Sequence, residues 1–260
     1  MRLLCALPLL LLAAPAQAEE REFCADRPGL GTPACTMAPG QVMAELGLAG
    51  WDHSADPGSV DDELALGAML VRLGLDRSTE IEVGMTAWTS LRSRDCASGT
   101  VSRIGGVGDV TLAVRHNFGG GTGPTAIHAF VTLPTGRNGI GAGDWGAGIL
   151  LPTGFDLPAG FQLDLTPEVD AAVNSSGSGR HFAWGGVAGL SHPLGKTLSL
   201  EAELGVWRDL DPGGHSTDAR ATLSLAWQAG PDWQIDFEAD AGLSAAAPRH
   251  SLLVGLARRF

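Results

Sequence analysis

The sequence contains no tyrosine and a single lysine, and charged residues make up only 18% of its 260 positions. Together with 44% hydrophobic residues, this low charge excludes a disordered chain, because such chains are highly charged and poor in apolar side chains. Acidic residues outnumber basic ones by 29 to 17, which gives a net charge of −12. We therefore expect no nucleic-acid partner, since nucleic-acid binding depends on a basic surface.

Long apolar runs are also missing after residue 18, where no segment has the roughly 20 predominantly apolar residues that a transmembrane helix needs. Residues 1–18 differ from the rest. They combine the basic Arg2, an apolar stretch over residues 3–14 and the small-residue site Ala16-Gln17-Ala18. This order is typical of a secretory signal peptide that is cleaved on export.

Three cysteines follow the expected signal peptide, and no Cys-x-x-Cys pair or Cys/His zinc spacing occurs. We accordingly expect no metal and no cofactor. Export permits disulfides, and Cys24 and Cys35 can close a small loop around residues 26–29. Cys96 lies far along the chain, so it stays free or pairs elsewhere.

Short segments in which apolar and polar residues alternate dominate the remaining chain. In residues 233–241, Trp233, Ile235 and Phe237 share one face, while Asp236 and Glu238 share the other. A period of two residues is typical of a β-strand. Twelve strands are predicted, at about residues 41–51, 63–75, 80–91, 109–118, 125–134, 144–155, 161–173, 181–191, 197–207, 218–228, 233–243 and 249–260.

The connections between these strands alternate between short and long, and no helices separate the strands as a parallel sheet would require. An even strand number, short turns at one end and longer loops at the other are typical of a bacterial outer-membrane barrel. We predict an all-β fold, an antiparallel transmembrane β-barrel over residues 41–260, preceded by a periplasmic N-terminal lead over residues 19–40. Both termini are then periplasmic. An exported soluble β-sandwich is the alternative, but its outward faces should be polar.

Aromatic residues near the strand ends support the barrel, because such rings form girdles at membrane interfaces. The lack of tyrosine counts against it, since girdles commonly use that residue. The final strand alternates and ends on Phe260. Such an ending resembles the signal that the outer-membrane insertion machinery recognises, so we expect this machinery and outer-membrane lipid as partners.

Four short motifs carry a family resemblance: Asp26-Arg27-Pro28-Gly29, residues 106–110 (Gly-Val-Gly-Asp-Val), residues 133–136 (Leu-Pro-Thr-Gly) and the terminal Phe260. Together they resemble the family of outer-membrane transporters linked to the meta-pathway of phenol degradation. The resemblance implies a β-barrel in the outer membrane of a Gram-negative bacterium. It also implies uptake of small aromatic or other organic compounds, and no catalytic residues.

One face of the predicted strands is rich in charge and should line the lumen. Its members are Glu45, Glu82, Arg115, Asp164, Glu168, Asp170, Glu201, Glu203, Arg220, Asp236, Glu238 and Asp240. They form either an acidic path that favours neutral or cationic solutes or a structural network of paired acids and arginines. Because carboxylates are in excess, complete pairing is not expected, and water should reach some of them.

Extending the alternation places Trp51, Trp88 and Trp207 on the inner side near the outer mouth, where they could stack with an aromatic solute. A β-bulge would instead turn them toward lipid. An outer-membrane lipid-modifying enzyme is a further alternative. It would need a histidine beside a nucleophile, and neither His116 nor His128 has an obvious partner.

From these features we expect an outer-membrane channel for small, aromatic or hydrophobic organic compounds, and not an enzyme. The alternative from another class is a structural or adhesive barrel whose lumen is sealed by its own ion pairs.

Overall fold

The computed structural model describes residues 21–260, so the expected signal peptide lies outside the described residues. The chain forms fourteen strands and one 3-10 turn, and no helix in this range is long and apolar enough to cross a membrane. The strands are β1 (Val42–Ala55), β2 (Ser59–Gly74), β3 (Thr79–Asp95), β4 (Val101–Gly106), β5 (Val110–Asn117), β6 (Ala126–Leu133), β7 (Gly146–Leu150), β8 (Thr153–Asp156), β9 (Gln162–Val173), β10 (Arg180–Pro193), β11 (Leu198–Asp209), β12 (Ser216–Gly230), β13 (Trp233–Gly242) and β14 (His250–Arg259), with η1 (Pro158–Gly160) before β9.

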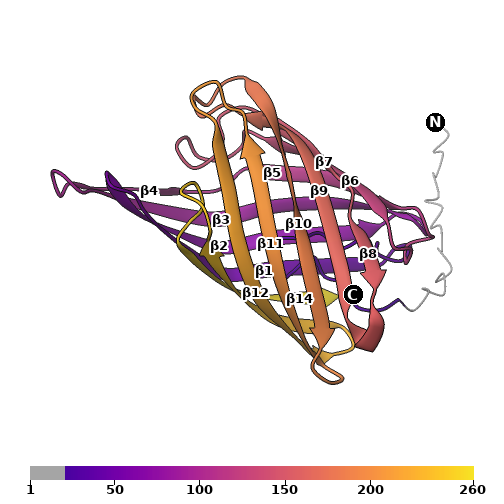
Figure 1. Ribbon diagram of the computed structural model, residues 1–260. Coiled ribbons are helices and arrows are strands. Elements are labelled where there is room, and N and C mark those ends of the chain that lie inside the picture. The colour runs from indigo at the N-terminus through magenta and orange to yellow at the C-terminus, as the bar shows by residue number, and fades with distance from the viewer. Residues whose placement is uncertain (1–20) are drawn as a thin grey trace, which may run out of the picture.

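Every strand pairs antiparallel with its neighbours, and the sheet closes because β1 pairs with β14 and β9 with β10. Two positions around the ring are each shared by two short strands. Strands β4 and β5 both pair with β3, and β7 and β8 both pair with β9. The prediction of a closed barrel with twelve strand positions is therefore confirmed. Figure 1 shows this barrel, with β2, β3 and β4 extending beyond the other strands.

Proline divides the segment predicted as one strand over residues 144–155. Pro152 has no N–H to donate to the sheet, so the ladder breaks between β7 and β8. The break is bridged by its neighbours, because the N–H of Ala126 donates to the Pro152 carbonyl and that of Leu151 donates to the Pro167 carbonyl. The barrel wall thus remains hydrogen-bonded across the interruption.

The expected long loop over residues 92–108 is largely a hairpin. Strand β3 continues to Asp95, and β4 returns along it from Val101. Cys96 lies exposed in the turn of this hairpin and forms no disulfide. The alternation signal was weak here because both faces of a hairpin that extends beyond the barrel contact water.

Polarity is inverted relative to a water-soluble domain. Large apolar side chains are exposed on the outer face, and they include Val71, Ile149, Leu204, Leu223 and Phe237. The buried set is dominated by charged and polar residues, and Arg72, Arg115 and Glu80 are fully buried. An apolar exterior with a polar interior is expected when the solvent around the barrel is lipid.

The two ends of the barrel differ. Both ends of the strand-forming chain and the short turns lie at one end, here called the turn end, and the longer connections lie at the other, the loop end. Trp227, Trp233 and Phe260 are exposed at the turn end, whereas Trp145 and Trp184 are exposed toward the loop end. This distribution matches two aromatic girdles.

Candidate functional site

Residues 21–41, here called the inner segment, lie within the barrel and contact inward-facing side chains of its wall. Glu45 on β1 accepts hydrogen bonds from the backbone N–H groups of Asp26 and Arg27, both at 3.0 Å. The sequence predicted a periplasmic lead over residues 19–40. Its described part is inside the lumen instead, because carboxylates of the barrel wall bind its backbone.

Two further carboxylates hold the same backbone. Glu238 on β13 accepts from the N–H of Gly29 at 2.8 Å, and Glu203 on β11 accepts from Leu30 and Gly31 at 2.7 and 2.8 Å. Such charge-assisted hydrogen bonds are stronger than neutral ones. Carboxylates that the sequence assigns to a solute path therefore anchor the inner segment.

The backbone at position 29 requires a glycine. Its φ of +115° is a left-handed conformation that other residues rarely adopt, and a Cβ there would lie 2.7 Å from Glu203 Oε2. The glycine thus lets the backbone approach the carboxylate closely. This gives a physical reason for the glycine in the Asp-Arg-Pro-Gly motif.

A cluster of buried arginines and acids fixes the start of the inner segment to β2, β3 and β5. Asp26 lies 2.6 Å from Arg115 Nη2 and 2.9 Å from Arg72 Nη1. Arg72 also pairs with Glu80 at 2.8 Å, and Arg115 pairs with Glu82 at 2.9 Å. Burial raises the pKa of Asp26, but the two guanidinium groups more than offset this effect and hold that pKa below its usual range.

Arg72 and Glu80 were not among the lining residues predicted from the sequence. Both have the inward phase of their strands, and Arg72 is paired across the sheet with Glu82. The signal existed, but the register of residues 63–75 was obscured by Gly67. Exposed apolar residues fall at Leu64 and Leu66 before this glycine and at Met69 and Val71 after it, so the outward phase changes there.

Arg27 extends from the inner segment toward β13 and passes beside β14 and β1. Its Nη2 lies 2.9 Å from Asp236 Oδ1, and its carbonyl accepts from the Gln234 amide at 2.6 Å. A Cβ at Gly255 would lie within 2.6 Å of its guanidinium, and one at Gly47 would lie 3.1 Å from it. Two glycines on β14 and β1 therefore leave room for this side chain.

Cys24 and Cys35 form a disulfide that closes a loop in the inner segment. Arg72 donates to the carbonyl groups of both cysteines, at 2.7 and 3.2 Å. The closed loop is consequently held by the wall as well as by its covalent bond.

The remaining predicted lining residues have partners other than the inner segment or are partly exposed. Trp207 lies on the inner side, and its Nε1 donates to Glu168 at 3.1 Å. Arg220 pairs with Asp218, and its guanidinium lies 5.9 Å from the Trp207 ring centre. Asp240 accepts from Thr222 at 2.7 Å. Asp164, Asp170 and Glu201 are only partly buried.

The aromatic mouth predicted from three tryptophans is wrong for two of them. A register shift between Gly47 and Ala49 reverses the faces of β1, so Trp51 pairs with the exposed Leu252 and is itself 37% exposed. Trp88 is 47% exposed and pairs with the exposed Leu66 beyond the phase change at Gly67. Both side chains face outward, and only Trp207 faces inward.

The inner segment leaves one side of the lumen open. A cavity of about 1010 Å³ lies between it and the wall from β8 to β13, toward the turn end. Asp164, Glu201 and Glu203 contribute carboxylates to its lining, and Phe161 stacks on His192 with ring centres 4.4 Å apart. Acidic side chains and an aromatic pair thus line the space that remains in the lumen.

Residues 25–260 match the family described as "Putative MetA-pathway of phenol degradation". The chain belongs to this family. The expectation from the four motifs is thereby confirmed over the whole barrel and most of the inner segment. No curated protein matches the sequence.

Solved barrels share the fold at low sequence identity. A COG4313 outer membrane channel from Pseudomonas putida F1 is 14% identical with a TM-score of 0.67, over 90% of this chain and 99% of that one. The beta domain of the Bordetella autotransporter BrkA is 13% identical with a TM-score of 0.56, over 85% of this chain and 100% of that one. The translocator domain of NalP from Neisseria meningitidis is 16% identical with a TM-score of 0.52, over 85% of this chain and 88% of that one. The fold is that of a bacterial outer-membrane β-barrel.

Proposed function

We propose that this member of the phenol-degradation family is an outer-membrane channel for small, aromatic or hydrophobic organic compounds, with its turn end in the periplasm. The cavity beside the inner segment carries the proposal, because about 1010 Å³ is ample for a monoaromatic compound. The family description and the fold shared with an outer membrane channel support the same reading. No catalytic step is part of the proposal, since the barrels that resemble this chain are channels and translocators.

The inner segment narrows the passage to the side of β9–β12. Glu45, Glu203 and Glu238 are engaged by its backbone N–H groups. Asp164 and Glu201 line the cavity and accept no hydrogen bond from the inner segment. The acidic path therefore consists of the carboxylates that the inner segment does not bind. These carboxylates favour neutral or cationic solutes over anions.

Phe260 has a separate role in this proposal. It ends the alternating strand β14 at the turn end and is 64% exposed, so its ring is available to the outer-membrane insertion machinery. Replacing Phe260 with Ala should lower the yield of heat-modifiable barrel in cells while leaving refolding into detergent intact.

A structural barrel with a sealed lumen is the second candidate, and the buried Arg72–Glu80–Arg115 cluster favours it. Planar-bilayer recordings distinguish the two. Stepwise currents with cation preference, together with faster entry of phenol-sized solutes into proteoliposomes, support the channel. A folded, heat-modifiable barrel without currents or solute entry contradicts it and supports the sealed barrel.

A further inference from the structure

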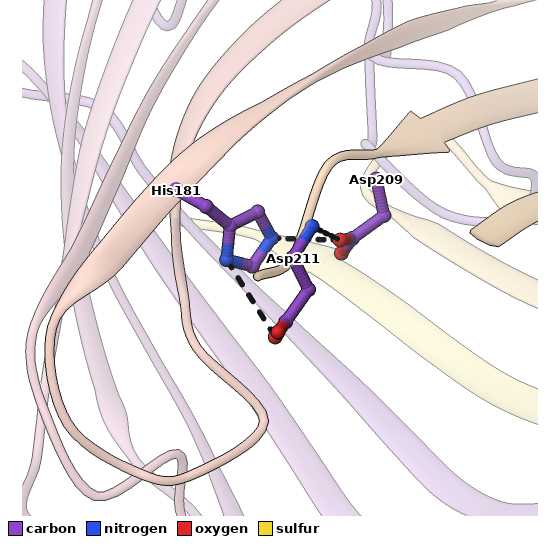
Figure 2. A group of neighbouring side chains, drawn as sticks. All are labelled: His181, Asp209 and Asp211. Atoms are coloured by element: carbon purple, nitrogen blue, oxygen red, sulfur yellow. Dashed lines mark hydrogen bonds and ion pairs between the residues drawn. The ribbon is translucent and has the colours of Figure 1, made fainter. Parts of the chain in front are cut away.

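Three metal-ligating side chains meet at the loop end, apart from the inner segment and its anchors. His181 is the second residue of β10, Asp209 is the last of β11, and Asp211 follows in the next loop. One donor atom of each lies within 4.8 Å of the others. Figure 2 shows the Asp209 carboxylate beside Nε2 of the imidazole and the Asp211 carboxylate beside Nδ1.

The hydrogen bonds around His181 leave one ring nitrogen as a lone pair. The side chain is only 4% exposed, and Nδ1 lies 3.0 Å from the Asn174 amide oxygen, which can only accept. In the neutral imidazole Nδ1 thus carries the hydrogen, and Nε2 presents a lone pair 2.8 Å from Asp209 Oδ1 without a hydrogen bond. Nε2 is buried but the Asp209 side chain is 38% exposed, so a cation from solvent can reach this pair of acceptor atoms.

The carboxylates are fixed in place before any ion binds. Asp211 accepts from the backbone N–H groups of Ser175 and Gly213, both at 2.5 Å, and these bonds hold the pKa of Asp211 below its usual value. Asp209 Oδ1 accepts from the N–H of Asp211 at 2.8 Å. The oxygens are therefore oriented by backbone contacts rather than by side-chain packing.

We propose that His181, Asp209 and Asp211 bind a divalent transition-metal ion, with Zn²⁺ as the best match. One imidazole and two carboxylates are a donor set that suits zinc. Two ligand atoms each about 2.1 Å from one ion lie about 3.0 to 3.4 Å apart, so the 2.8 Å between Nε2 and the Asp209 oxygen must lengthen by a few tenths of an ångström when the ion binds. The ion joins β10, β11 and the loop after β11 at the rim of the barrel, and water completes its coordination.

Zinc titration of the chelator-treated, refolded barrel in detergent tests the site, with calorimetry and elemental analysis after dialysis as readouts. We expect one equivalent of Zn²⁺. His181→Ala and Asp209→Asn should each weaken binding at least tenfold. The matched control is His215→Ala, because His215 is an exposed histidine in the loop that contains Asp211, and this variant should bind zinc like the unmodified protein.

Absence of saturable binding by the folded barrel would overturn the proposal, as would zinc affinities of His181→Ala and Asp209→Asn equal to that of the unmodified protein. Heat-modifiable migration verifies that each variant is folded. If His181→Ala fails to fold, the Co²⁺ absorption spectrum of the Asp209→Asn variant decides. A spectrum changed from that of the unmodified protein supports ligation by Asp209, and an identical spectrum contradicts it.

Discussion

The two sides of the lumen differ in whether their buried carboxylates are paired with arginine. Against β2, β3 and β5, the arginines Arg72 and Arg115 balance Asp26, Glu80 and Glu82 at contact distance. Against β9–β12, Asp164 and Glu201 lack a comparable cation and border the cavity. Paired charges can be packed without water, whereas unpaired carboxylates must keep it. The distribution of arginine along the barrel thus decides which side is sealed and which stays open.

Removal of a buried arginine should reduce the difference between the sealed and the open side of the lumen more than the other substitutions below. Arg115→Ala removes the guanidinium that pairs with Glu82 and one of the two that pair with Asp26, and breaking such a buried pair costs about 3–5 kcal/mol. We expect a lower midpoint of urea unfolding and larger currents as the inner segment detaches. Arg103→Ala is the control, because Arg103 is exposed on β4. Equal midpoints in the two variants would contradict a structural role for the cluster.

A substitution that displaces the inner segment without changing its charge should have the next largest effect on conductance. In Gly29→Val the side chain collides with Glu203 and the positive φ is strained, at a cost of about 1–3 kcal/mol. Single-channel conductance should rise several-fold. Gly58→Ala, where a Cβ meets nothing within 4 Å, should conduct normally. An unchanged conductance in Gly29→Val would show that the segment does not restrict the passage.

Neutralising the open side tests the acidic path. Asp164→Asn combined with Glu201→Gln should lower the cation-to-anion permeability ratio a few-fold, seen as a shift of the reversal potential in a salt gradient. Asp95→Asn, at the exposed β3–β4 turn, is the control. Glu203→Gln with Glu238→Gln should act differently, raising conductance as well, because those carboxylates hold the backbone of the inner segment. Unchanged reversal potentials in both double variants would contradict an acidic path.

Acidification should give the smallest effect. The pKa of Asp26 is lowered in the folded barrel from an ordinary value of 3.8, so its contribution to docking is complete above about pH 4. It is lost as the pH falls through the lower folded value. The part of the conductance change that depends on Asp26 should therefore appear only below about pH 4 and should be absent when the same titration is recorded for Asp26→Asn. Asp26→Asn should show the raised conductance already at pH 7.

Much of the barrel followed from alternation, and the errors have identifiable causes. The strand positions were predictable because lipid outside and polar groups inside impose a period of two on each strand. Alternation alone placed Trp51 and Trp88 inward, and the alternative of an irregularity that turns them toward lipid is the correct one, because a single irregularity reverses every later residue of a strand. The bulge at Gly47 and the phase change at Gly67 have no signature that separates them from the other glycines of this glycine-rich chain.

Alternation along each strand was enough to predict the closed barrel, its apolar exterior and its acidic interior, and four short motifs were enough to predict the family. These properties arise from neighbouring residues along the chain, so they can be read without knowing what lies opposite. The folded barrel was needed to show that residues 21–41 occupy the lumen, that Glu203 and Glu238 bind backbone and that His181 meets Asp209 and Asp211. Each of these contacts joins residues far apart in the chain, and the closure of the barrel brings them within bonding distance.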